Sequence, residues 1–144
     1  MVDIDHFKGI NDRYGHLVGD HVLREVGRIL SETLRSTDFT ARYGGEEVVV
    51  ILPQTAEEQA RILAERLRGA IADARFVHDG EAFSITVSIG VSALQPGALT
   101  RRKDLLEKAD KALYQAKHLG RNQVCTSLGP VDRTVEALGA AQAG

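Results

Sequence analysis

The chain of 144 residues is long enough for one domain with a buried core, and its formal net charge of −2 gives no support for bulk binding to nucleic acid or an anionic membrane. Its single cysteine, Cys125, excludes an internal disulfide and fits a reducing compartment. No apolar run approaches the length of a membrane span, and the first residues do not resemble a signal peptide. We therefore expect a cytoplasmic domain with no DNA or RNA partner.

The first half of the chain predicts alternating strands and helices. The run from Val48 to Leu52 is apolar at every position, which is typical of a central strand covered on both faces. An amphipathic pattern before it predicts a helix with one apolar face. The expected elements are a strand over residues 1–5, a polar turn or single helical turn over 6–12, a helix over 20–34, and strands over 39–43 and 47–52.

The second half predicts two more helices and three short strands. A capping box from Thr55 to Glu58 opens a helix that ends near Ala74. Asp79-Gly80 then turns a hairpin into a strand in which apolar residues alternate with Ser, Thr and Gly, as in a strand with one buried face. A last amphipathic helix stops at Gly120. The expected ranges are 55–74, 76–78, 83–91, 102–118 and 123–127.

The order β-α-β-β-α-β, followed by one more helix and strand, predicts an α/β (α+β) fold with a mixed central sheet flanked by helices. In this topology the first strand lies beside the strand pair that follows, so Asp3 and Glu46 can come together. We expect residues 1–127 to form the domain. Residues 128–144, which are set apart by Pro130, are expected to form a flexible tail or a frayed helix.

Two acidic clusters lie at the ends of predicted strands: Asp3-Ile4-Asp5, and Gly44-Gly45-Glu46-Glu47. Carboxylates are costly to gather at one edge of a sheet unless a cation compensates them. Convergent carboxylates that leave room for phosphate oxygens are how proteins hold Mg²⁺ for phosphoryl or nucleotidyl transfer. Either cluster alone reads as the solvated end of a strand, whereas the two together favour a metal site.

Several motifs occur in the order and at the spacing of one known family. They are VDIDHFKGIND at residues 2–12, GH at 15–16, GD at 19–20, RYGGEE at 42–47, SIGV at 88–91, ADKALYQAK at 109–117 and GRN at 120–122. From residue 1 to about 127 the chain resembles the GGDEF domains, the diguanylate cyclases of bacteria. The resemblance implies their nucleotide-cyclase or palm-like fold of βαββαβ type.

The resemblance implies synthesis of cyclic di-GMP from two GTP, with release of two pyrophosphates, by a homodimer in which each domain holds one GTP. It implies two Mg²⁺ ions per site, with Mn²⁺ as a substitute, held by Asp3, the Ile4 carbonyl and Glu46. Glu47 is either a further ligand or the base that takes the hydroxyl proton. Gly44 and Gly45 let the turn approach the phosphates, although an ordinary tight turn would also use them.

The resemblance also assigns residues to the nucleotide. Asn11 and Asp20 match the guanine readers, because a carboxylate can accept from both guanine donors; a turn residue and a helix N-cap are their other readings. Lys8, Lys117 and Arg121 are the expected triphosphate cations, although the last two could merely suit a helix C-terminus. Asp5 is expected to be structural, with its side chain turned away from that of Asp3.

Arg35-Ser36-Thr37-Asp38 matches the RxxD motif through which many family members bind their product as an inhibitor. A guanidinium can pair with phosphate or stack on guanine, and Arg66 would add a secondary contact. A surface ion pair between Arg35 and Asp38 is the alternative.

The chain departs from the family pattern in two ways. Its signature continues with Val48 where Phe is usual, so that a void could open beside the metal site. The family's first helix, with a DxLTGLxNR-type motif, and the start of its first strand are absent. We therefore expect the 144-residue chain to be marginally stable or self-associating, with little cyclase activity, and upstream sequence to rescue both; a sensory or receiver domain could precede it in the full gene product.

Three functional classes remain open. The first is an active cyclase, which the presence of every catalytic residue type favours. The second is a weak or inactive module that binds cyclic di-GMP or a protein partner, which the shortened start and Val48 favour. The third is another two-metal nucleotidyl transferase on a similar sheet, against which Asn11, Asp20 and the GGEE turn argue.

Overall fold

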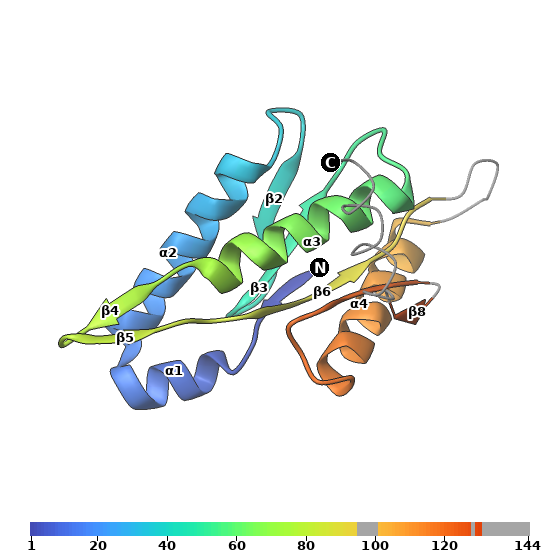
Figure 1. The fold of residues 1–144 in the computed structure, drawn as a ribbon. Helices are drawn as coiled ribbons and strands as arrows, with labels where there is room; N and C mark the ends of the chain where they lie inside the picture. The colour runs from blue at the N-terminus through green and yellow to red at the C-terminus, as the bar shows by residue number, and fades with distance from the viewer. Residues whose placement is uncertain (95–100, 128, 131–144) are drawn as a thin grey trace, which may run out of the picture.

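The computed structural model describes residues 1–94, 101–127 and 129–130, and contains a mixed six-stranded sheet with helices on both faces (Figure 1). The strands of this sheet are β1 (Val2–Ile4), β2 (Phe39–Arg42), β3 (Glu47–Ile51), β6 (Val87–Val91), β7 (Val124–Thr126) and β8 (Gly129–Pro130). A separate hairpin consists of β4 (Phe76–His78) and β5 (Glu81–Phe83). The helices are α1 (Phe7–Tyr14), α2 (His16–Thr33), α3 (Glu57–Asp73) and α4 (Arg102–His118). The predicted fold class is confirmed.

Strand β1 lies in the middle of the sheet, whose order is β2-β3-β1-β6-β7-β8. It is antiparallel to both neighbours, and Val2 is the partner of Val48 on one side and of Ile89 on the other. Asp3 therefore lies opposite Glu47, beside the turn that joins β2 to β3. This register brings the two acidic clusters to one edge of the sheet, as the predicted topology required.

Hydrophobic cores lie on both faces of the sheet. Helices α2 and α3 cover one face, where Val22 and Ile71 are fully buried. Helix α4 covers the other face, where Ala116 packs with the buried Cys125. Burial of apolar surface is the main stabilising contribution to a small domain. The packing of these three helices on the sheet therefore holds in place the strands that carry the acidic clusters.

Strand β6 is buried at all five positions, whereas the sequence predicted one buried face. Val87 and Ile89 face the larger core, and Gly90 lies against α4. A Cβ on Gly90 would meet the Ala109 carbonyl oxygen at 2.1 Å and the Leu113 backbone nitrogen at 2.3 Å. The prediction was wrong because small residues on this face admit a closely packed helix instead of solvent.

Strand β3 differs in the opposite sense. It lies between two other strands, as expected, but the prediction that both of its faces are packed against other elements was wrong. Val48 and Val50 pack against the larger core, whereas Ile51 is 57% exposed. Because side chains alternate along a strand, one face of β3 is packed and the other is left largely open.

A groove of about 670 Å³ separates β3 from β6 beyond the start of β1. The Met1 amino group donates to the Gly90 carbonyl at 2.7 Å, and the Gly90 N–H donates to the Met1 carbonyl at 2.9 Å. Beyond this pair, no described strand lies between β3 and β6. The walls of the groove are apolar and include Val50, Leu52, Val91, Leu63, Leu67 and Leu105.

Two helix starts differ from the predictions. Helix α2 begins at His16, about one turn before the expected start, and the expected turn before it is the eight-residue helix α1. Helix α3 has Ala56 as its N-cap residue, and the Ala56 N–H donates to the Gln59 side chain at 3.1 Å. The Thr55 hydroxyl instead donates to the Pro53 carbonyl at 3.0 Å, so the predicted capping box was placed one residue too early.

The later strands also differ in detail. The expected strand over 83–91 is divided into β5, which pairs with β4, and β6, which pairs with β1. Within the expected tail, Gly129–Pro130 pairs with β7 as β8, and residues 128 and 131–144 lie outside the described residues. Among the helices that the structure describes, none combines the length and the apolar character needed to cross a bilayer.

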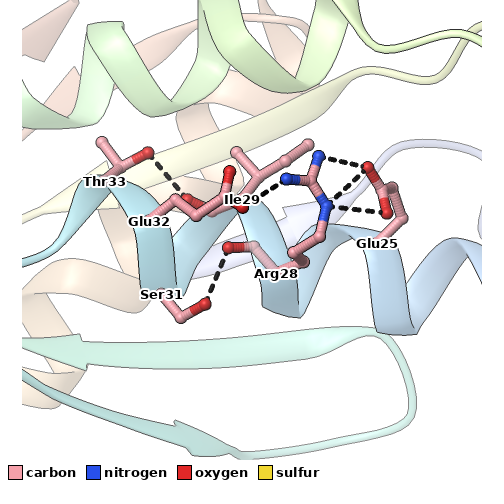
Figure 2. Close-up of polar contacts among 6 residues, drawn as sticks. All are labelled: Glu25, Arg28, Ile29, Ser31, Glu32 and Thr33. Atoms are coloured by element: carbon pink, nitrogen blue, oxygen red, sulfur yellow. Dashed lines mark hydrogen bonds and ion pairs between the residues drawn. The ribbon is translucent and has the colours of Figure 1, made fainter.

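The exposed face of α2 carries an ion-pair network near the end of the helix. Figure 2 shows Arg28 between Glu25 and Glu32, each about one turn away along the helix. The hydrogen bond from Arg28 lowers the pKa of Glu25. The Thr33 hydroxyl donates to the Ile29 carbonyl at 2.7 Å. Exposed pairs of this kind add little to global stability, but they support the last turn of α2 locally.

Candidate functional site

Asp3 lies at the centre of the acidic edge. Its side chain is buried at 5% exposure, and its carboxylate accepts a hydrogen bond from Lys117 Nζ at 2.8 Å. Burial raises the pKa of Asp3, the hydrogen bond and charge of Lys117 lower it, and the charges of Glu46 and Glu47 raise it again. Asp3, Glu46, Glu47 and Lys117 are therefore brought together, and the lysine compensates the acidic cluster only in part.

The turn between β2 and β3 is closed by the Glu47 carbonyl, which accepts from the Tyr43 N–H at 2.8 Å and the Gly44 N–H at 3.3 Å. A Cβ on Gly44 would lie 2.7 Å from Glu47 Oε2, so glycine lets this carboxylate lie over the turn. A Cβ on Gly45 would meet nothing within 4 Å. Arg42 Nη2 donates to the Gly45 carbonyl at 2.7 Å. Gly44 is thus required by packing within the turn, and Gly45 presents an open backbone.

The donor set at this edge suits a hard divalent cation. In the described part of the chain, no three acidic, His or Cys side chains are close enough to hold a metal ion together. Asp3, Glu46 and Glu47 nevertheless offer carboxylate oxygens, the ligands that Mg²⁺ prefers, and the pKa of Asp3 is raised first by burial and to a smaller extent by the charges of Glu46 and Glu47. The Ile4 N–H donates to the Glu46 carbonyl at 3.4 Å and ties the two clusters together. A divalent cation would compensate the same charges that one lysine compensates in this structure.

Asn11 and Asp20 lie where α1 meets α2. Asn11 packs against Gly19, where a Cβ would be 1.9 Å from Asn11 Oδ1. Gly15, with φ +86°, makes the turn between the helices, and its N–H donates to the Asn11 carbonyl at 2.9 Å. Gly15 is also the N-cap of α2, so the reading of Asp20 as an N-cap is wrong. The Asp20 side chain is exposed one turn into the helix. Lys8 is exposed on α1.

The two basic residues near the end of α4 have different settings. Lys117 lies in the last turn of the helix and contacts Asp3. Arg121 lies beyond the helix, which ends at His118, and has a left-handed backbone with φ 62°. The Arg121 N–H donates to the Ala116 carbonyl at 3.0 Å. Arg121 is therefore presented by a tight loop and not by the helix itself.

Asp5 is the acidic residue that the sequence analysis misplaced. Its carboxylate accepts from the Asn122 N–H at 3.0 Å, in the loop that follows α4. Asp3 is bonded by Lys117 from α4 itself, so both carboxylates are approached from the α4 side of the sheet. Residues two apart along a strand share a face, and this spacing was the signal that could have placed Asp5 correctly.

Arg35 and Asp38 form a tight turn between α2 and β2. The Asp38 carboxylate accepts from the Arg35 N–H at 2.9 Å, and the Asp38 N–H donates to the Arg35 carbonyl at 3.0 Å. Arg66, from α3, donates to the Thr33 carbonyl at 2.9 Å and so lies at the same end of α2. At 1.5 Å of rise per residue, this turn lies about 20 Å along α2 from Asp20. The RxxD residues are thus gathered at the opposite end of α2 from Asp20.

The family described as "Diguanylate cyclase, GGDEF domain" matches residues 1–123. The chain is 46% identical over 127 residues to Diguanylate cyclase A of Treponema denticola, covering 88% of this chain and 34% of that protein. It is 49% identical over 124 residues to Diguanylate cyclase DgcP of Pseudomonas aeruginosa, covering 86% of this chain and 18% of that protein. The chain thus spans about a third or less of the length of these relatives.

Solved structures give the same result. The GGDEF domain of DgcB from Caulobacter crescentus, in complex with c-di-GMP, superposes with a TM-score of 0.83 at 37% identity and covers 89% of this chain and 75% of that one. The active GGEEF domain of a diguanylate cyclase from Vibrio cholerae superposes with a TM-score of 0.81 at 38% identity and covers 88% of this chain and 79% of that one. With a family match over residues 1–123, the chain belongs to the GGDEF domain family of diguanylate cyclases.

Proposed function

We propose that this domain condenses two GTP into cyclic di-GMP with release of two pyrophosphates, and that it does so with Mg²⁺. The observation that carries the proposal is the buried carboxylate of Asp3 at a sheet edge that it shares with Glu46 and Glu47. The names of the relatives, two of which are diguanylate cyclases, support the reaction class.

The reaction joins two nucleotides held by two facing copies of the domain. The 3′-oxygen of one GTP forms a bond to the α-phosphorus of the other, and the bond from that phosphorus to the bridging oxygen of the β-phosphate breaks. Pyrophosphate leaves with the bonding electrons, and the hydroxyl proton passes to a carboxylate. Glu47, the first residue of β3, lies opposite Asp3 and is the candidate for this base or for a further metal ligand. A second transfer in the opposite sense closes the ring.

Asp3, Glu46 and the Ile4 carbonyl would hold the cation, of which two per site are expected, with Mn²⁺ as a substitute. Bound there, it would neutralise the triphosphate and stabilise the charge that develops on the leaving pyrophosphate. Lys117 would exchange its contact with Asp3 for a phosphate oxygen, and Arg121 and Lys8 would add further positive charge. The open backbone at Gly45 would leave room for the phosphates beside the turn, and Gly44 lets the Glu47 carboxylate lie over the same turn.

The most direct test is product formation. The domain with upstream sequence restored, held as a dimer and incubated with GTP and Mg²⁺, is expected to yield cyclic di-GMP and two equivalents of pyrophosphate on chromatographic analysis, whereas the 144-residue chain alone is expected to show little turnover. Addition of a chelator should stop the reaction, and Mn²⁺ should restore it. GTP consumed to any other product would overturn the proposed reaction.

Base selection gives a second expected result, because Asn11 and Asp20 would read guanine. A carboxylate can accept from guanine N1–H and its amino group, whereas adenine presents an acceptor at N1. Asp20→Ala should weaken GTP binding by about 1–3 kcal/mol, the loss of a charge-assisted hydrogen bond, and ATP should not compete. Calorimetry measures both effects, with Asp12→Ala on the exposed face of α1 as the charge-matched control. Equal affinity for ATP and GTP would contradict this assignment.

Product feedback is proposed at the turn of Arg35 and Asp38, with Arg66 as an additional contact. The backbone of this turn already orients the Asp38 carboxylate, and Arg66 is held beside it by Thr33. The DgcB domain, which this chain resembles, was solved in complex with c-di-GMP. If the domain proves to be a weak cyclase, binding of cyclic di-GMP at this turn is the alternative function.

Arg35→Ala should lower the affinity of the isolated domain for cyclic di-GMP at least tenfold, because a guanidinium pairs with phosphate and alanine cannot. Titration calorimetry with cyclic di-GMP is the measurement. Arg13→Ala, which removes an exposed arginine from α1, is the matched control. An affinity that is unchanged in Arg35→Ala would show that the turn has no role in binding.

Partners other than nucleotides are also proposed. A second copy is required for the reaction, and a sensory or receiver domain would control how two copies meet. SiaD of Pseudomonas aeruginosa, 37% identical with a TM-score of 0.81, was solved in complex with its activator SiaC, which supports control of such domains by protein partners.

A further inference from the structure

Asp5, which is not among the proposed metal ligands, has a buried carboxylate that joins the residues after β1 to the start of β6 and to the loop after α4. Asp5 is 4% exposed, and its two oxygens accept three hydrogen bonds. Oδ1 accepts from the Ser88 hydroxyl at 2.7 Å, and Oδ2 accepts from the Thr86 hydroxyl at 2.7 Å and from the Asn122 N–H at 3.0 Å. Both hydroxyls belong to the start of β6 and the residues before it, whereas the N–H belongs to the loop after α4.

The loop that Asp5 holds has an unfavourable backbone. Arg121 and Asn122 are consecutive residues with φ 62° and φ 47°; this left-handed conformation costs Arg121 about 1–2 kcal/mol, whereas asparagine tolerates it better. Such a conformation persists only where the surroundings fix it. Here the Arg121 N–H donates to Ala116, and Arg68 Nη1 donates to Asn122 Oδ1 at 2.7 Å. The bond to Asp5 joins this loop to the strand that carries Asp3.

Two links therefore connect β1 to the end of α4: Lys117 to Asp3 at 2.8 Å, and the Asn122 N–H to Asp5 at 3.0 Å. In the proposed reaction Lys117 leaves Asp3 to bind phosphate, so the first link is given up. The Asp5 link uses no group that contacts the nucleotide. It would hold Arg121 in place while the other link is broken.

We propose that Asp5 is a positioning residue that holds the loop of residues 120–122 so that Arg121 reaches the triphosphate. This inference rests on the proposed function. It assigns to Asp5 no contact with metal or nucleotide, and its effect on GTP binding passes through Arg121.

The test measures GTP binding in the presence of Mg²⁺ by calorimetry, with a non-hydrolysable GTP analogue as the probe. Asp5→Ala should weaken binding about tenfold, the scale of one lost charge-assisted hydrogen bond. Ser88→Ala and Thr86→Val remove the other bonds of the same carboxylate and should leave the affinity within twofold of the wild type. Asp5→Asn should be close to wild type, because its amide oxygen can accept from Asn122 while its amino group donates to Ser88.

A second pair of variants acts from the loop and leaves the buried carboxylate in place. Asn122→Pro removes the N–H and the left-handed backbone, and Asn122→Gly keeps the N–H and adopts the backbone without strain. The proline variant should lose about tenfold in affinity and the glycine variant little. A double-mutant cycle with Arg121→Ala separates positioning from folding: in that background neither Asp5→Ala nor Asn122→Pro should weaken binding further.

Three results are decisive. Unchanged GTP affinity in folded Asp5→Ala or Asn122→Pro would overturn the positioning role and leave the proposed function intact. Full additivity with Arg121→Ala would also overturn it, because the effect would then not pass through Arg121. Failure of the wild-type domain to bind the GTP analogue would overturn the proposed function and this role together.

Discussion

Replacement of either Asp3 or Glu46 by alanine is expected to abolish cyclic di-GMP formation. Asp3 is buried and Glu46 lies in the neighbouring turn, and both would hold the cation that compensates the triphosphate. Loss of a ligand removes several kcal/mol of transition-state stabilisation, which corresponds to a loss on the order of 10³-fold in turnover. The measurement is the initial rate of product formation with saturating GTP and Mg²⁺.

The control for this experiment is Glu58→Ala, which removes an exposed carboxylate from α3 and should leave turnover unchanged. Thermal unfolding of each variant checks that the loss is not one of structure. Asp3→Asn keeps the shape of the buried side chain, and so it should fold like the wild type but turn over slowly. Turnover within threefold of the wild type in both alanine variants would rule out these residues as metal ligands.

The sequence predicted the meeting of Asp3 and Glu46 because it depends on element order alone. A short first strand followed by a helix and a strand pair has few ways to form a mixed sheet, and one of them places the first strand beside the pair. The observed register, with Asp3 opposite Glu47, agrees with this. The motif spacing by which the resemblance assigns residues to the nucleotide depends equally on local sequence.

Which faces of an individual strand are buried could not be predicted in this way. Periodicity reports which residues are apolar but not which neighbour supplies the contact. The alternating pattern predicted that Ser88 and Gly90 lie on an exposed face of the strand. In the structure α4 packs directly on Gly90, and Ser88 is fully buried. Ile51 resembles a buried residue, yet it is 57% exposed. In each case the deciding fact is the position of an element distant in the sequence.

Asp5 shows the same limit for polar residues. The sequence analysis turned its side chain away from that of Asp3, although residues two apart along a strand share a face, and its three hydrogen-bond donors come from residues more than 80 positions away. Nothing local in the sequence identifies Asn122 as a partner. Long-range polar contacts of this kind set the geometry of the site and become visible only in the folded chain.

The groove between β3 and β6 leads to the second large expected effect, a gain in stability from an added strand. Val2 is opposite Val48 and Ile89, so each step back along β1 advances one residue on both neighbours. Met1 is therefore opposite Val49 and Gly90. Three residues placed before Met1 would lie opposite Val50 and Val91, Ile51 and Ser92, and Leu52 and Ala93, all of which line the groove.

The Met1 amino group gives this experiment a pH signature. Burial lowers the pKa of this amine from its ordinary value of 8.0 to about 6, with a smaller opposing effect from Asp110. The unfolded chain therefore binds more protons than the folded chain between pH 6 and 8, so the free energy of unfolding should rise with pH over this range. A peptide bond at Met1 replaces the amine by an uncharged N–H, which can still donate to the Gly90 carbonyl, and the pH dependence from this group should disappear.

Addition of Val-Ile-Val directly before Met1 is expected to raise the free energy of unfolding by about 3 kcal/mol relative to Ser-Thr-Ser at the same position. The two valines would lie opposite Val50 and Leu52 on the packed face and contribute about 1.5–3 kcal/mol each, the isoleucine would lie beside the exposed Ile51 and contribute less, and the cost of ordering the backbone is common to both extensions. Ser-Thr-Ser at the same position is the matched control, because it supplies the same backbone without the apolar side chains. Urea unfolding measures the difference, and size-exclusion chromatography should show less self-association for the apolar extension. Equal stability of the two extended chains would show that the groove is not completed by an apolar strand, and the exposure of Ile51 would then need another partner.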